Sequence, residues 1–146
     1  MLAVGRGAVE VDGVMSLSAP STCNPLAMGT QELLLSQGFV ESPSSRTDQL
    51  LQIGACFLQE QIDSPEEHAL LDLLASSDSP VLIVHGEDDP TVSVESAVSI
   101  AASANKPTLV RIPKANHIFN TPNPFPVDGT PSPELQAVWD AIEGWL

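Results

Sequence analysis

The chain has 146 residues, a length that suits one domain with a buried core, and 42% of them are hydrophobic. Its 19 acidic and 5 basic side chains give a formal net charge of −14, which opposes binding to nucleic-acid phosphates and to anionic membrane surfaces. We therefore expect a soluble, acidic, globular protein with no nucleic acid and no membrane among its partners.

The two cysteines, Cys23 and Cys56, and the lack of a secretory or transmembrane pattern near Met1 predict a reducing, cytoplasmic location. This expectation applies to the sequence as it stands. A signal encoded upstream of Met1 would change it.

The first predicted strand covers residues 13–18, and the following region, residues 21–79, is expected to be helical. Within that region, residues 31–37 contain three consecutive leucines and predict a short helix.

A second helix is predicted from a cap at Thr47 or Asp48 through Ile62, because apolar residues recur there at helical spacing. A third helix is predicted after Ser64, since Ser-Pro-Glu-Glu combines a capping residue, a proline suited to the first turn and Glu67 as a capping-box partner.

Residues 81–84 form a Val-Leu-Ile-Val run that predicts a strand buried on both faces. Asp89 follows in the turn beyond its carboxyl end. A covering helix is predicted at residues 95–104, followed by a strand at 108–112 and then by His117. Because the carboxyl ends of parallel strands lie at one edge of a sheet, we expect the side chains of Asp89 and His117 to meet there.

A proline-rich loop and a helix at residues 132–146 complete the chain. A carboxylate that accepts one ring N–H holds an imidazole in the tautomer that a general base needs. Asp89 is our choice for that carboxylate. Asp88 is adjacent, but in a tight turn it points in a different direction.

These motifs resemble those of the α/β-hydrolases. The residues His85-Gly86, Asp89 and Val92 match a His-Gly-x-x-Asp-x-x-Val pattern after a late strand, and Ala115-x-His117 matches the pattern after the last strand. The tail looks most similar to the dienelactone-hydrolase and serine-aminopeptidase-like branches.

The resemblance follows element order over residues 8–146 and is specific over residues 80–125. It implies an α/β fold of about three parallel strands covered by helices. It also implies that Asp89 and His117 are the acid and base of a Ser/Cys-His-Asp catalytic triad.

The nucleophile of such a triad is not evident, because no Gly-x-Ser-x-Gly or Gly-x-Cys-x-Gly motif occurs. We interpret Cys56 as a small buried apolar residue, and Cys23 lacks neighbouring glycines. Ser16 and Ser18 lie in a predicted strand where no elbow turn is encoded. We therefore predict no nucleophile within this chain.

The strand at 13–18 resembles the one that follows the nucleophile-bearing helix in complete α/β-hydrolases. Too few residues precede it for the earlier strands and their crossovers. We thus expect residues 1–146 to be the carboxyl-terminal part of such a domain. Residues 21–79 would cover the sheet or form a cap, and their periodic leucines favour covering helices.

The chain is then predicted to supply part of a hydrolase for a small-molecule ester, thioester or amide, and to be inactive alone. One alternative is a non-catalytic remnant that serves as an interaction module, and another is a truncated gene model that does not fold alone. An exposed strand at 13–18 predicts self-association.

A metal site formed by His85, Glu87, Asp88 and Asp89 is an alternative interpretation of this turn, but carboxylates on successive residues rarely surround one ion. We expect no metal and no cofactor. His85 is interpreted as a packed residue at a strand end, and His68 as a solvated one.

Overall fold

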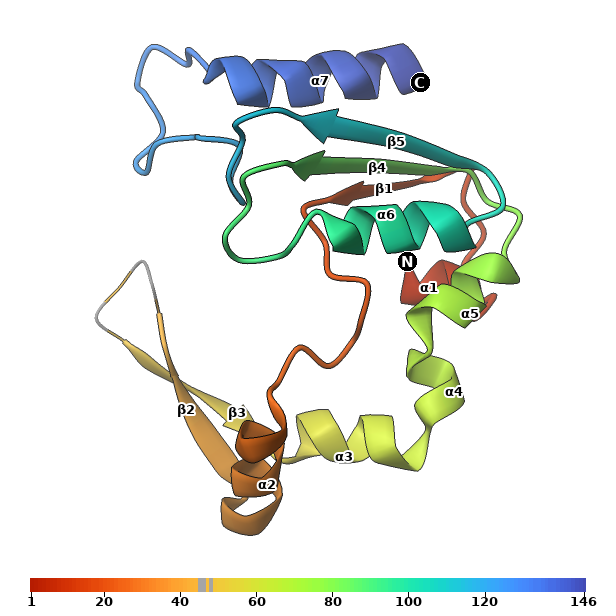
Figure 1. Ribbon diagram of the computed structural model, residues 1–146, viewed down its shortest axis with the longest axis vertical. Helices are drawn as coiled ribbons and strands as arrows, with labels where there is room; N and C mark the ends of the chain where they lie inside the picture. Colours follow the sequence, from red (N-terminus) through yellow and green to blue (C-terminus); the bar gives the residue numbers. More distant parts are fainter. Residues whose placement is uncertain (45–46, 48) are drawn as a thin grey trace. The chain divides into compact units, whose positions relative to one another are not determined.

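The computed structural model describes residues 1–44, 47 and 49–146, which form two compact units (Figure 1). The first unit joins residues 1–21 to residues 70–146 and holds a three-stranded sheet. The second unit comprises residues 22–69 and holds a two-stranded sheet. No helix in the described part of the chain is long and apolar enough to cross a membrane.

The sheet of the first unit has the order β1-β4-β5, with β1 at Val14–Leu17, β4 at Val81–Gly86 and β5 at Pro107–Ile112. Both pairings are parallel. All six residues of β4 are buried, as expected for a central parallel strand rich in β-branched residues. In the β4–β5 register, Gly86 is paired with Ile112, so the two strands end side by side.

Helices cover both faces of this sheet (Figure 1). On one face α6, at Glu95–Ser103, contacts β4, β5 and α5, which spans Leu70–Ala75. On the other face α7, at Pro133–Trp145, contacts β4 and β5. A short helix α1, at Leu2–Gly5, packs against α5.

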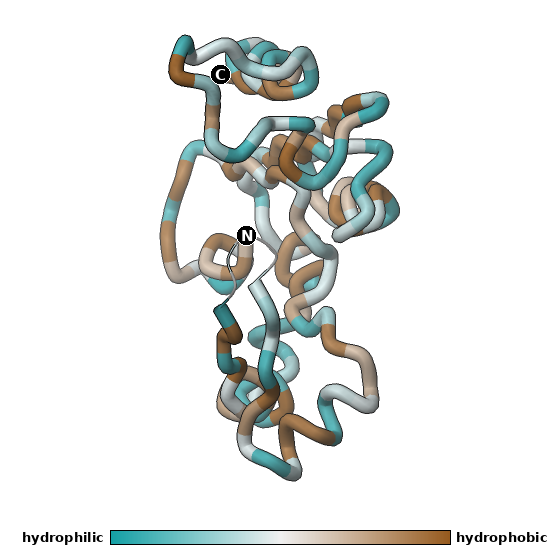
Figure 2. Tube along the Cα trace, turned by 90° about the vertical axis from the view of Figure 1, so that its left-hand side faces the viewer, coloured by the Kyte–Doolittle hydropathy of each residue, from teal (hydrophilic) through white to brown (hydrophobic). Residues whose placement is uncertain are grey.

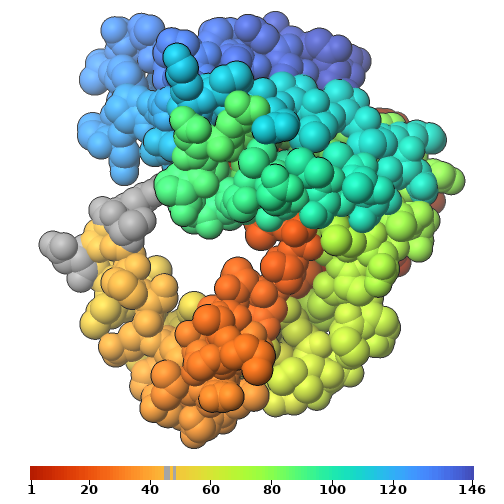
Figure 3. All heavy atoms as spheres, viewed as in Figure 1, coloured from red at the N-terminus to blue at the C-terminus, as the bar shows by residue number. Residues whose placement is uncertain are grey.

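The main core lies between the sheet and α7. Its buried members are Leu82, Val84, Ile112, Ala115, Phe119 and Val138. Because side chains alternate along a strand, His85 belongs to the face of β4 opposite to Leu82 and Val84. Helix α7 carries both hydrophobic and hydrophilic residues (Figure 2), and it lies at the surface beside the proline-rich loop that precedes it (Figure 3).

The second unit begins with α2, at Met28–Gln37, which ends at Gly38 in the left-handed region with φ 84°. Strand β2, at Phe39–Pro43, pairs antiparallel with β3, at Leu50–Gly54. Two further helices complete the unit: α3 at Cys56–Asp63 and α4 at Pro65–His68.

The helix predicted from Thr47 or Asp48 through Ile62 is wrong in its first half. Strand β3 occupies Leu50–Gly54, and the helix begins only at Cys56; Asp48 lies outside the described residues. The apolar run in β3 is compatible with the periodicity of a helix or of a strand, and its pairing with β2 makes it a strand. The region at 21–79 is therefore not wholly helical.

The helix predicted after Ser64 is present as the short α4. It ends at His68, its capping residue makes no side-chain capping bond, and a separate helix, α5, follows.

Candidate active site

The turn after β4 and the loop after β5 lie directly against each other. The backbone N–H groups of Glu87 and Asp88 donate to the carbonyl oxygens of Ile112 and Ala115, both at 3.0 Å. A Cβ at Gly86 would collide with the carbonyl of Ala115, so only glycine allows this close approach. This packing brings the two sequence-predicted site residues to the same end of the sheet.

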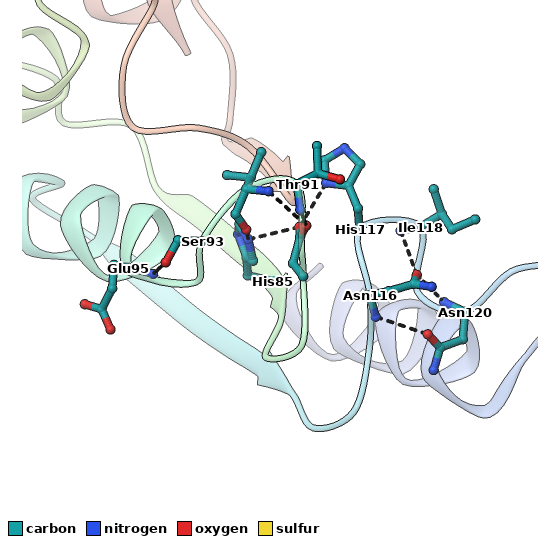
Figure 4. Close-up of polar contacts among 10 residues, drawn as sticks. His85, Thr91, Ser93, Glu95, Asn116, His117, Ile118 and Asn120 are labelled. Carbon is teal, nitrogen blue, oxygen red and sulfur yellow. Dashed lines mark hydrogen bonds and ion pairs between the residues drawn. The ribbon is translucent and has the colours of Figure 1, made fainter. Parts of the chain in front are cut away.

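Asp89 is held through both of its carboxylate oxygens, with partners that include Thr91 and His117 (Figure 4). Oδ1 accepts hydrogen bonds from the backbone N–H groups of Thr91, at 2.8 Å, and Val92, at 2.9 Å. Oδ2 lies 2.9 Å from Nδ1 of His117. The Asp89 side chain is fully buried, whereas the His117 side chain is 37% exposed.

Two opposing effects set the pKa of Asp89. Burial by itself raises it, but the hydrogen bonds from the Val92 N–H, the His117 ring and the Thr91 N–H, together with the charge of His117, lower it. The hydrogen bonds prevail, so the pKa of the Asp89 carboxyl lies below its ordinary value. The carboxylate therefore stays ionised at neutral pH.

An ionised carboxylate only accepts hydrogen bonds, so Nδ1 of His117 carries the proton of this contact. The other ring nitrogen, Nε2, is then the basic one in the neutral imidazole. It makes no hydrogen bond to any described residue, and it points away from Asp89 (Figure 4). Such an imidazole can accept a proton from a group that reaches it from solvent.

The loop that carries His117 is fixed by two asparagines. Oδ1 of Asn116 accepts from the N–H groups of Ile118, at 3.0 Å, and Asn120, at 2.9 Å. In return, Asn120 accepts from the Asn116 N–H and donates to the carbonyl of Lys114. Sequence reasoning missed this pair. The signal was present, since asparagine tolerates the positive φ of 54° found at Asn120.

Ser132 links the same loop to α7. Its hydroxyl donates to the carbonyl oxygen of Phe119 at 2.6 Å and accepts from the N–H of Leu135 at 3.0 Å. Ser132 is thus the N-cap of α7 and an anchor for the His117 loop.

Of the other candidate nucleophiles, Cys56 lies where β3 passes into α3, whereas neither serine lies at a strand-to-helix turn. Ser16 lies within β1 and Ser18 directly after it; both are buried, and their hydroxyls have no partner among the described residues. Cys23 lies in a loop and is partly exposed. Cys56 begins α3 and is exposed, so the expectation that it is buried is wrong.

The remaining histidines differ from one another. His85 is fully buried at the end of β4, as its interpretation as a packed residue requires. His68 was expected to be solvated, and that is wrong: its side chain is 12% exposed and Nδ1 lies 2.9 Å from the carbonyl oxygen of Ser64.

The described residues contain no group of three or more His, Cys, Asp or Glu side chains that could hold a metal ion. In the acidic turn after β4, Glu87 pairs instead with Arg111 of β5 at 3.0 Å.

No family model matches the chain, and no curated protein matches it. Solved structures do. Est1E of Butyrivibrio proteoclasticus matches 99% of this chain with a TM-score of 0.68 at 21% identity. The same protein with ferulic acid bound matches 99% with a TM-score of 0.64 at 18% identity. A monoacylglycerol lipase of Paleococcus ferrophilus matches 97% with a TM-score of 0.65 at 17% identity.

The chain spans only part of each of these structures, 53%, 52% and 61% of their lengths in the same order. At these identities the likeness concerns the fold. The chain therefore has the fold of a carboxyl-terminal half of an α/β-hydrolase.

Proposed function

We propose that Asp89 and His117 are the acid and base of a catalytic triad that hydrolyses an ester, thioester or amide bond. The observation that carries this proposal is the 2.9 Å hydrogen bond between the fully buried side chain of Asp89 and the His117 side chain, which is 37% exposed. A buried carboxylate that orients an accessible imidazole meets the requirement for a general base. The fold shared with an esterase domain of a Rhodothermus marinus protein and with a lipase supports the same assignment.

In the proposed mechanism, Nε2 of His117 accepts the proton of a serine hydroxyl or cysteine thiol. The oxygen or sulfur of that serine or cysteine attacks the carbonyl carbon of the substrate. Asp89 remains ionised, which its lowered pKa favours, and stabilises the imidazolium. His117 then gives the proton to the leaving alcohol, thiol or amine. Finally, the same imidazole activates a water that hydrolyses the acyl-enzyme.

We also propose that the nucleophile is supplied from outside these 146 residues. The sequence contains no Gly-x-Ser-x-Gly or Gly-x-Cys-x-Gly motif. Ser16 and Ser18 are buried, where no substrate carbonyl reaches them. The chain alone should then show no turnover of short-chain nitrophenyl esters beyond that of buffer. Turnover that disappears in His117→Ala would show that the nucleophile lies within the chain.

The decisive test uses a longer protein. The reading frame upstream of Met1 should encode a nucleophile elbow, and a chain extended to include it should hydrolyse the esters. In that protein Asp89→Asn should lower kcat by about 10⁴-fold, while Asp88→Asn, a matched change at the adjacent carboxylate, should have little effect. Equal losses of kcat in both variants would contradict the assignment of Asp89 as the acid of the triad.

The substrate panel is chosen from the ligand of one similar structure. Because Est1E has been solved with ferulic acid bound, a feruloyl ester belongs in the panel beside aliphatic esters, thioesters and amides.

A second candidate function, an interaction module without catalysis, is favoured by the free edge of β1. This strand pairs only with β4 among the described residues, and Met15 and Leu17 are 40% and 46% exposed. This function would be favoured over the hydrolase if the reading frame upstream of Met1 encoded no nucleophile elbow and the chain hydrolysed no ester.

A further inference from the structure

His85 contacts the same turn that carries Asp89. Its side chain is fully buried, and its Nε2 lies 2.9 Å from the carbonyl oxygen of Val92 and 3.3 Å from Oδ2 of Asp89. Both oxygens are acceptors, so Nε2 must carry a proton. The other ring nitrogen, Nδ1, has no hydrogen-bond partner among the described residues.

We propose that His85 is a positioning residue that fixes the Asp89 carboxylate for its hydrogen bond to His117. This inference rests on the proposed function of that pair. It assigns His85 no contact with substrate, only a role exerted through Asp89.

The Val92 peptide is held by hydrogen bonds on both sides. Its N–H donates to Oδ1 of Asp89, at 2.9 Å, and its carbonyl oxygen accepts from His85. The three residues thus close a ring of polar contacts. One member of the ring, His85, belongs to a fully buried strand that is paired on both sides. The rigid strand therefore restrains a turn that is otherwise partly exposed.

Oδ2 of Asp89 lies between two imidazole nitrogens. Nδ1 of His117 is at 2.9 Å and Nε2 of His85 is at 3.3 Å. Rotation of the carboxylate away from His117 would also move it away from the proton on His85. With an apolar residue at position 85, neither that restraint nor the anchor on the Val92 carbonyl would remain.

The competing explanation is that His85 only fills space. Two substitutions separate the explanations, because glutamine and methionine have nearly the same length and volume. His85→Gln keeps an N–H donor that can reach the Val92 carbonyl, whereas His85→Met has none. Ile83→Val, a buried change on the same strand, serves as a control that lowers stability without touching the ring of contacts.

The measurement is NMR of the full chain labelled with ¹⁵N-histidine, at a pH above about 8, where an ordinary imidazole is neutral. The His117 signals are assigned from a His117→Gln variant. We expect a proton on Nδ1 of His117 in the wild type, in Ile83→Val and in His85→Gln. In His85→Met we expect loss of that Nδ1–H signal and a mixture of the two tautomers.

The outcomes distinguish this inference from the proposed function. An intact Nδ1–H signal in a folded His85→Met variant overturns the role of His85 but leaves the Asp89–His117 pair in place. A wild type without the signal contradicts the pair itself. If His85→Met does not fold, His85→Asn replaces it, because its shorter amide does not reach the position of Nε2.

Discussion

Among single residues, Asp89 is the most tightly held side chain of the site. Two backbone N–H groups fix Oδ1, and Oδ2 faces ring nitrogens of His85 and His117. An isosteric amide would keep one acceptor oxygen but would turn an NH₂ group toward two N–H donors. The charge and the geometry of this carboxylate are therefore both needed.

Asp89→Asn should lower the free energy of unfolding at pH 7 by about 1–3 kcal/mol, because a buried charge-assisted hydrogen bond is lost. The difference from wild type should depend on pH. The pKa of Asp89 in the folded chain lies below its ordinary value of 3.8. Its stabilisation is hence complete above that value and is lost as pH falls through the lower, folded-state pKa.

Urea unfolding at several pH values measures this effect. The gap between wild type and Asp89→Asn should be constant above about pH 5 and should narrow below about pH 4. Asp88→Asn, at an exposed neighbour, should stay within about 0.5 kcal/mol of wild type throughout. A gap that widens in acid would show that the carboxylate is not stabilised in its ionised form.

At the scale of elements, Ser132 couples α7 to the loop that carries His117. One hydroxyl caps the helix and also donates to the carbonyl of Phe119. The helix that covers the core and the loop that presents the base thus share a hydrogen-bonding group.

Ser132→Ala should destabilise the first unit by about 1–2 kcal/mol, the usual cost of a lost helix cap. It should also speed amide hydrogen exchange at Ile118 and Asn120, because the loop loses an anchor. Ser99→Ala is the matched control, since that exposed hydroxyl bonds only within α6. Unchanged exchange in the His117 loop would mean that the two asparagines hold it without α7.

The sequence was most informative where a local residue pattern matches the position of the segment in the folded chain. The β-branched run of β4 predicts its burial, and the motif after it predicts that Asp89, not Asp88, faces His117. The hairpin of β2 and β3 was missed, because its strands lack a clear alternation and depend on pairing with each other. The contact of His85 with Asp89 was missed for a similar reason, since only the folded turn brings them together.

At the scale of the molecule, β1 combines an unpaired edge with apolar exposure. It pairs only with β4 among the described residues. A hollow of about 440 Å³ lies at its amino-terminal end, lined by Asp12, Gly13, Met15, Pro80, Trp145 and Leu146. Unpaired N–H and C=O groups next to exposed apolar side chains favour pairing with another chain, whereas the net charge of −14 opposes association.

We expect the isolated chain to self-associate through this edge, more strongly as salt screens its charge. Leu17→Lys should shift the population toward monomer, because a charged residue on an edge strand disfavours pairing. Val98→Lys, at an exposed residue of α6, should leave association unchanged. Light scattering after size-exclusion chromatography decides the matter, and a wild type that is monomeric at all salt concentrations would contradict the prediction.

The two tryptophans both lie on α7, and the chain has no tyrosine. Trp139 is 42% exposed, while Trp145 packs against the core cluster and lies directly over Gly13. Intrinsic fluorescence therefore observes one helix and the start of β1. Emission from Trp145 should respond both to undocking of α7 and to any chain that pairs with β1, so one optical signal can follow unfolding and association without an added label.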